Sequence, residues 1–338
     1  MKKNDTILLD HGSGGVASQE LIRDIFLSRL DNPVLACLED SAIIETDRGR
    51  IAFSTDSYVV DPLFFPGGDI GLLAVHGTIN DLAMRGAKPL CLSLGMILEE
   101  GLPLDDLKRI AASIARACRD SGVPVVTGDT KVVQKGKGDK VFINTSGIGL
   151  VDNGLEISAK MAKPGDAVIL SGSMGDHGIT ILAKRAGIAL LGDLRSDTMA
   201  LHRLVQKLLA AVPGAVHTLR DPTRGGVATS LNEIAAAAGV AIELDESEIP
   251  IKPQVAAACE ILGLDPLYLA NEGKCLVLVD GVHAAAALAA MQELPEGRDA
   301  RIVGRVTDGV TGHVVLHTAA GGSRIVRALT GEPLPRIC

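Results

Sequence analysis

The chain of 338 residues has no tryptophan, and aromatic residues make up only 2% of it. Because 47% of the residues are nevertheless hydrophobic, the core has to be built mainly from Ala, Val, Ile and Leu, as is common in sheets covered by helices. No uninterrupted apolar run approaches the roughly 20 residues of a membrane-spanning helix, and no apolar leader follows the first residues. These absences favour a soluble protein of the cytoplasm.

Positive charge and paired cysteines are also scarce. The 41 acidic residues outnumber the 33 basic ones, which gives a net charge of −8, and no basic run is present. A nucleic-acid binder needs a basic surface, so this function class is disfavoured. The six cysteines are scattered without a Cys-x-x-Cys pair, which argues against a zinc site and a disulfide framework and fits a reducing compartment.

Each half of the chain shows strand-like and helix-like segments. The predicted strands of the first half are 6–9, 42–46, 51–54, 90–97, 123–126 and 141–149, and its predicted helices are 18–30, 70–85 and 104–121. The second half is predicted to hold strands at 167–170, 241–244, 274–279 and 301–306 and helices at 228–238 and 282–294. The length exceeds one comfortable core. We therefore predict an α+β or α/β protein with domains at 1–152 and 153–326 and a flexible tail at 327–338.

The tail ends on a cysteine. Gly331, Pro333 and Pro335 disfavour helix and sheet before Cys338, and proline favours an extended path. At about 3.1 Å per residue, the segment from Thr330 to Cys338 could span about 25 Å. The sequence predicts either an arm that carries a reactive thiol or a frayed terminus that happens to end in cysteine.

Several acidic residues and one asparagine stand near strand ends or on one predicted helix. They are Asp40, Asp56, Asn80, Asp81 and Asp129. Ligands gather at strand ends in sheets flanked by helices, and hard cations such as Mg²⁺ take carboxylates together with substrate phosphates. The four aspartates therefore suggest a metal–triphosphate site better than a single general base, although any one of them could be a turn or cap residue.

A glycine-rich turn follows the first predicted strand. Gly12, Ser13, Gly14 and Gly15 come directly after His11. Glycines let the main chain approach an anion closely, so these N–H groups could bind phosphate. The turn matches neither the Walker pattern nor the dinucleotide G-x-G-x-x-G pattern, and taken alone it could be only a turn.

Ordered motifs along the chain resemble the ATP-binding superfamily of aminoimidazole ribonucleotide synthetase. They are Asp40-Ser41-Ala42, Ser54-Thr55-Asp56, Ile79-Asn80-Asp81 continuing to Lys88-Pro89, Thr127-Gly128-Asp129-Thr130-Lys131, Asp221-Pro222-Thr223-Arg224-Gly225-Gly226 and Ala270-Asn271-Glu272-Gly273. Within this superfamily, the glycine-rich turn and the terminal Pro335-Arg336-Ile337-Cys338 resemble the HypE family of hydrogenase maturation factors. The resemblance covers nearly the whole chain.

The resemblance implies a fold and a reaction. The N-terminal domain would bind ATP and pair with its twin in a homodimer, contributing strands to a β-barrel with the nucleotide in a cleft at the interface. The C-terminal domain, a sandwich-like α/β unit, would close over it. A carbamoyl group received on Cys338 from HypF would be dehydrated with ATP and Mg²⁺ to a thiocyanate. The cyanide would then pass to iron on the HypC–HypD complex for the hydrogenase active site.

This carbamoyl dehydratase chemistry assigns roles to particular residues. Phosphorylating the carbamoyl oxygen makes it a leaving group, so acids for the metal and a cation for phosphate are expected. We expect Lys131 to be that cation and Glu272 to be the base for the N–H proton, with a solvated lysine and a turn carboxylate as the alternative readings. Arg224 is expected on phosphate, on the α-carboxylate of Cys338, or in a structural salt bridge.

Two histidines are assigned differently. His76 shares the predicted 70–85 helix with Asp81 but lies off its face, so it is assigned to packing. His177 is expected in a loop that could touch phosphate or the tail, although a simple turn is the plainer reading.

Two other functions stay open. One is a different ATP-dependent phosphotransferase of the same superfamily, such as thiamine-phosphate kinase or selenophosphate synthetase. Selenophosphate synthetases carry a reactive Cys or Sec near the N-terminus, whereas the first cysteine here is Cys37. The other is a non-enzymatic, ATP-gated carrier whose tail ferries a group made elsewhere.

Overall fold

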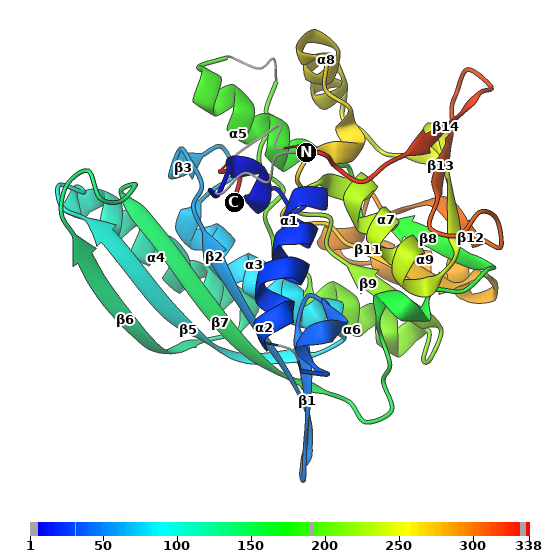
Figure 1. The fold of residues 1–338 in the computed structure, drawn as a ribbon, viewed down its shortest axis with the longest axis horizontal. Coiled ribbons are helices and arrows are strands. Elements are labelled where there is room, and N and C mark those ends of the chain that lie inside the picture. Colours follow the sequence, from blue (N-terminus) through cyan, green and yellow to red (C-terminus); the bar gives the residue numbers. More distant parts are fainter. Residues whose placement is uncertain (1–5, 31, 189–191, 332–335) are drawn as a thin grey trace.

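The computed structural model describes residues 6–30, 32–188, 192–331 and 336–338. The chain folds into two α/β domains, each built on its own mixed sheet (Figure 1). A third, two-stranded sheet pairs β3 (Phe64–Phe65) with β4 (Gly68–Asp69). The two-domain α/β architecture predicted from the sequence is confirmed.

The first sheet has the strand order β1-β2-β7-β5-β6. The bounds are β1 (Ala42–Thr46), β2 (Gly49–Tyr58), β5 (Lys88–Glu99), β6 (Val125–Val133) and β7 (Val141–Val151). β5 and β6 run parallel, and the other neighbours are antiparallel. Buried residues alternate with more exposed ones along β7, which is the pattern of a sheet covered on one face. The strand predicted at 123–126 is observed two residues later and is longer.

Helices α3 (Ile70–Met84) and α4 (Leu104–Ser121) cover one face of this sheet. α3 packs on β2 and β7, and α4 packs against α3. The side chain of Asp69 caps α3 by accepting hydrogen bonds from the N–H groups of Gly71 and Leu72. α4 ends at Gly122, which has the left-handed conformation that favours glycine. Both helices match their predicted bounds to within one residue.

The opposite face of the sheet, here called the outer face, exposes large apolar side chains. Phe53, Ile97, Ile148 and Leu150 are between 38% and 47% exposed. Phe53 and Ile148 lie directly opposite each other on β2 and β7. The described residues of a single chain thus leave an apolar sheet face in contact with water.

The second sheet has the strand order β14-β13-β10-β12-β8-β11-β9. The bounds are β8 (Asp166–Leu170), β9 (Val216–Arg220), β10 (Ala241–Asp245), β11 (Leu276–Asp280), β12 (Arg301–Thr307), β13 (Val314–His317) and β14 (Ser323–Val326). β8 is buried along its whole length, and β11 along all but its last residue. Continuous apolar runs of this kind are expected where helices cover both faces of a sheet.

Helices lie on both faces of the second sheet. α6 (His202–Ala211) and α9 (Ala284–Gln292) share one core with it, and α7 (Gly226–Ala238) packs in the core of the other face. α5 (Asp176–Ala186) and α8 (Pro253–Leu262) contact each other, and α5 also contacts β3. α5, α6 and α8 were not predicted from the sequence. Within the described ranges, the helices are too short or too polar to cross a membrane.

The N-terminal segment is helical from Val16 to Leu30. It consists of α1 (Val16–Leu21), a π-helical stretch (Ile22–Leu27) and α2 (Ser28–Leu30). The helix predicted at 18–30 is therefore confirmed, with an earlier start. The strand predicted at 6–9 is wrong, because this stretch pairs with no strand and Leu9–Gly12 form a 3₁₀-helix, where His11 Nδ1 accepts a hydrogen bond from the N–H of Leu8.

Candidate active site

The last residues of the chain are docked in the interior. Figure 1 places the C-terminus close to β3 and α5, and Ile337 and Cys338 are only 3% and 8% exposed. The last three carbonyl oxygens all accept hydrogen bonds, from Asp61 N–H and Arg185 to residue 336, from His177 Nε2 to residue 337 and from Val59 N–H to residue 338. The flexibility of the 327–338 tail stays a prediction, but these hydrogen bonds hold residues 336–338 at its tip in place.

The thiol of Cys338 lies beside the predicted base. Glu272 lies close enough for its charge to act on the buried thiol of Cys338. Burial raises the pKa of the thiol, Arg224 opposes this, and the charges of Glu272 and Asp56 raise the pKa further. Burial and neighbouring carboxylates also raise the pKa of Glu272. A carboxylate whose pKa is raised in this way is a stronger base than an exposed glutamate once it is ionised.

The backbone of Glu272 is held on both sides. Its N–H donates to Asp197 Oδ1 at 3.0 Å, and its carbonyl accepts from Asn80 Nδ2 at 3.2 Å. Asn80 also donates to the carbonyl of Met199 and accepts from the N–H of Leu201. Since these bonds occupy both ends of the buried amide, we assign Asn80 to positioning Glu272 and joining the two domains, and its role in binding nucleotide stays a prediction.

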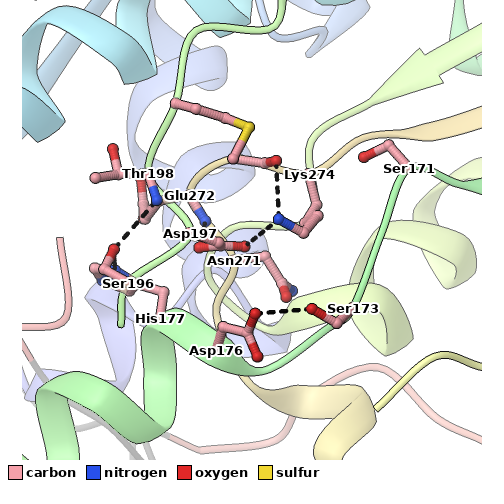
Figure 2. Close-up of polar contacts among 12 residues, drawn as sticks. Ser171, Ser173, Asp176, His177, Ser196, Asp197, Thr198, Asn271, Glu272 and Lys274 are labelled. Carbon is pink, nitrogen blue, oxygen red and sulfur yellow. Dashed lines mark hydrogen bonds and ion pairs between the residues drawn. The ribbon is translucent and has the colours of Figure 1, made fainter. Parts of the chain in front are cut away.

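Buried polar residues surround this peptide segment (Figure 2). Lys274 Nζ lies 3.3 Å from Asp197 Oδ2, and both side chains are almost fully buried. Asp176 accepts hydrogen bonds from Ser173 and from Lys252. Asp197 was not predicted from the sequence, because it lies in an irregular segment that carries no recognised motif.

Asp40 belongs to a charged cluster beneath the glycine-rich turn. Arg220 bridges Asp40 at 2.9 Å and Glu233 at 2.8 Å. Burial raises the pKa of Asp40 to about 8, with Arg220 opposing and Asp221 adding to the rise. Burial likewise raises the pKa of Asp221 to about 6. Asp40 Oδ2 is buried without a hydrogen-bond partner among the described residues. A cation bound at this oxygen would favour the ionised form of the carboxyl and lower its pKa.

Asp81 lies close enough to this cluster for the charges of Asp40 and Asp221 to act on it. Ser54 donates to Asp81 Oδ2 at 2.6 Å. Burial raises the pKa of Asp81, and the carboxylates of Asp221, Asp56 and Asp40 raise it further. Three of the four predicted metal-binding aspartates therefore share one electrostatic environment.

The glycine-rich turn is folded tightly against the second domain. Gly14 has φ +77°, and a Cβ on Gly15 would lie 2.3 Å from the carbonyl oxygen of Leu329. The hydroxyl of buried Ser13 accepts from the N–H of Gly15. Glycine is thus required at residue 15 by close backbone approach.

A cavity of about 330 Å³ joins the turn to the charged cluster. Arg224 donates to the carbonyl of Gly12 at 3.1 Å at its edge. Its lining includes Gly12, Gly14, Asp40, Arg220, Asp221 and Arg224. A cavity with glycine backbone, two arginines and several acids can accept an anionic phosphate together with a divalent cation.

Asp129 and Lys131 lie apart from this cluster. Both side chains are about two-thirds exposed on β6, and they form an ion pair with each other. Across the described residues, no group of three or more His, Cys, Asp or Glu side chains is arranged to hold a metal ion.

Asp221 and Arg220 were not assigned to the site from the sequence. Asp221 directly follows β9 (Val216–Arg220), so the strand-end argument that selected Asp56 and Asp129 applies to it equally. The signal was present, but the strand itself was not predicted.

Two family profiles match the chain. The N-terminal domain of AIR synthase related proteins matches residues 38–151, and the C-terminal domain matches residues 163–317. A relative from Cupriavidus necator named "Carbamoyl dehydratase HypE" is 55% identical over 99% of this chain and 96% of its own length.

Two solved structures are also similar to this chain in sequence and fold. A hydrogenase maturation protein HypE in complex with ATP is 51% identical with a TM-score of 0.83, covering 98% of this chain and 100% of that one. A HypE in a HypE–HypF complex is 47% identical with a TM-score of 0.87, covering 91% and 99%. With the terminal cysteine seated beside Glu272 and the phosphate-sized cavity nearby, these similarities lead to one conclusion: the chain belongs to the HypE family of the AIR synthase related proteins.

Proposed function

We propose that this protein dehydrates a carbamoyl group on Cys338 to a thiocyanate at the expense of ATP, and so supplies cyanide ligands for the iron of [NiFe] hydrogenase. The observation that carries the proposal is the burial of the C-terminal thiol in a site where the charge of Glu272 raises its pKa, with the carbonyl of the preceding Ile337 held by His177.

The reaction balances in two steps. The carbamoyl oxygen attacks the γ-phosphorus of ATP, ADP leaves, and Glu272 takes one proton from the nitrogen. The C–O bond then breaks, phosphate departs with the oxygen, and loss of the second N–H proton leaves S–C≡N on Cys338. Phosphoryl transfer depends mainly on positioning and electrostatics, which the glycine-rich turn, Arg224 and the acids supply in this proposal.

The acids fit the Mg²⁺ that accompanies ATP. Asp40, Asp56 and Asp81 would hold the ion, as the buried unpaired oxygen of Asp40 and the mutual repulsion of the carboxylates support. The metal would neutralise charge on the phosphates and on these acids together.

We further propose a homodimer through the outer face of the first sheet. The exposed apolar side chains of that face support it, since monomers rarely leave such a surface in water. A second copy packed there would complete the β-barrel and bring Asp129 and Lys131 to the nucleotide. Lys131 would then act on the γ-phosphate or the carbamoyl oxygen, and residues 1–152 would form the ATP-binding and dimerisation domain.

Sedimentation velocity tests the dimer. Ile148→Asp should shift the protein to monomers and abolish dehydration, whereas Val282→Asp, at a residue 88% exposed outside this face, should change neither. A dimeric Ile148→Asp protein would contradict the proposal.

The tail must also leave its seat. Because Cys338 is buried, it has to move outward to receive the carbamoyl group from HypF and to deliver cyanide to the HypC–HypD complex, and the 327–338 tail is proposed to provide that movement. Six free thiols suit these exchanges in the reducing cytoplasm.

Intact mass spectrometry of the carbamoylated protein tests the function. Addition of Mg-ATP should remove the mass of one water from the Cys338 peptide and form ADP. ADP without mass loss would favour another phosphotransferase, and neither change would favour a carrier that only binds ATP.

A further inference from the structure

His177 stands at the junction of the tail and the second domain. It lies in the first turn of α5, is fully buried, and its ring packs edge-on against Phe65 with 5.7 Å between centroids. Its Nδ1 lies 2.8 Å from Ser196 Oγ, and its Nε2 lies 2.8 Å from the carbonyl oxygen of Ile337. Both ring nitrogens therefore have defined partners.

These partners decide which nitrogen carries the proton. The carbonyl of Ile337 can only accept, so Nε2 must carry hydrogen. Burial lowers the pKa of His177, which favours the neutral ring, and Nδ1 then accepts from the hydroxyl of Ser196.

Ser196 is itself fixed without help from the tail. Its N–H donates to the carbonyl of Pro66 at 2.9 Å, and its Oγ accepts from the N–H of Thr198 at 3.2 Å (Figure 2). The hydroxyl hydrogen is thus directed to His177, and the Nε2–H is preorganised as a donor before the tail arrives.

The seat is shared between the domains. Val59 and Asp61, which hold the carbonyls on either side, belong to the first domain, whereas His177 belongs to the second. We propose that His177, oriented by Ser196, is a positioning residue that binds the carbonyl of Ile337 and so holds the carbamoylated Cys338 at Glu272. The inference rests on the proposed function and adds a residue that, together with Arg185 of α5, links the seating of the tail to the second domain.

The test compares His177→Leu, which removes the donor, with His177→Gln, which keeps one. Iodoacetamide labelling of Cys338, measured by peptide mass against exposed Cys37, reports tail seating. Loss of one neutral hydrogen bond should raise labelling in the leucine variant roughly twofold to tenfold. Single-turnover dehydration should fall by a similar factor while ATP affinity stays unchanged. Glutamine should restore much of both rates.

Ser196→Ala should show a smaller effect of the same sign, and His283→Leu, at an exposed histidine, should show none. Wild-type labelling and dehydration in His177→Leu would overturn the inference. The inference would also be overturned if His177→Gln were as impaired as His177→Leu in labelling and dehydration and if ATP binding were weakened too. His177 would then be an ordinary core residue. If Mg-ATP removes no water from the carbamoylated wild-type protein, the proposed function fails. The labelling experiment still shows whether His177 holds the tip of the tail in place.

Discussion

Replacement of Glu272 by glutamine isolates its chemistry from its position. The backbone contacts with Asn80 and Asp197 do not involve the substituted carboxyl, and glutamine has nearly the same shape. A positioned general base contributes about 10²–10⁴-fold, so single-turnover dehydration should slow by about that factor. ATP affinity should change little, because the cavity at the glycine-rich turn is not lined by Glu272.

The pH dependence adds a second readout. Because the pKa of Glu272 is raised, the wild-type rate should climb as the carboxyl ionises and then level off, and the glutamine variant should lose this dependence. The charge of Glu272 also raises the pKa of Cys338, so the variant thiol should react with iodoacetamide at lower pH. Glu248→Gln, at an exposed site, is the control. Equal losses of dehydration and ATP binding would remove Glu272 from the base role.

Three further outcomes are expected. Asn80→Ala should lower the free energy of unfolding by about 2–5 kcal/mol in a denaturant titration, because it leaves two buried backbone groups and one half-buried one without their partner; a loss below about 1 kcal/mol would contradict the assignment. Without nucleotide, the melting temperature should fall as the pH rises from about 4 to about 8. Folding raises the pKa of Asp40 from 3.8 to about 8 and that of Asp221 from 3.8 to about 6. In this pH range the folded chain therefore keeps protons that the unfolded chain releases. Asp40→Asn should flatten that decline. Cys338→Ala should still bind ATP in calorimetry, and failure to bind would show that the tip of the tail forms part of the nucleotide site.

Patterns within one stretch of chain correctly predicted the helices and strands whose limits are set by nearby residues. The spacing of apolar residues in α4 and the glycine that ends it lie within one stretch of chain, and the predicted bounds match. The strands at 42–46 and 167–170 were recognised for the same reason. Two of the strands that were missed, β13 and β14, are short and have exposed residues, so that only their neighbouring strands define them.

The residues of the candidate site also divide into those that a local pattern identifies and those that only the fold brings together. Asp40 was selected by its place beside a strand, Asp81 by its place on a predicted helix, Glu272 by its motif and Cys338 by its place at the end of the tail, and the fold brings all four into one region. Asp197 could not be predicted, because its importance lies in a hydrogen bond to the backbone of Glu272 across 75 positions of sequence. The raised pKa values arise only when carboxylates distant in sequence share a buried site, and a sequence read one residue at a time treats each as a turn or cap residue.

Asp129 and Lys131 show what a motif leaves undetermined. Their motif placed them with the other acids, yet within one chain they are exposed on the edge strand β6. Motif resemblance records that residues serve the same site, but not whether they come from the same copy of the chain. If a second protomer covers the outer face, the same two side chains can reach the nucleotide without any change in fold. A Lys131→Ala chain mixed with a Glu272→Gln chain should then recover dehydration in the mixed dimer, because one of the two sites would receive both intact residues, whereas sites built from one chain alone would recover none.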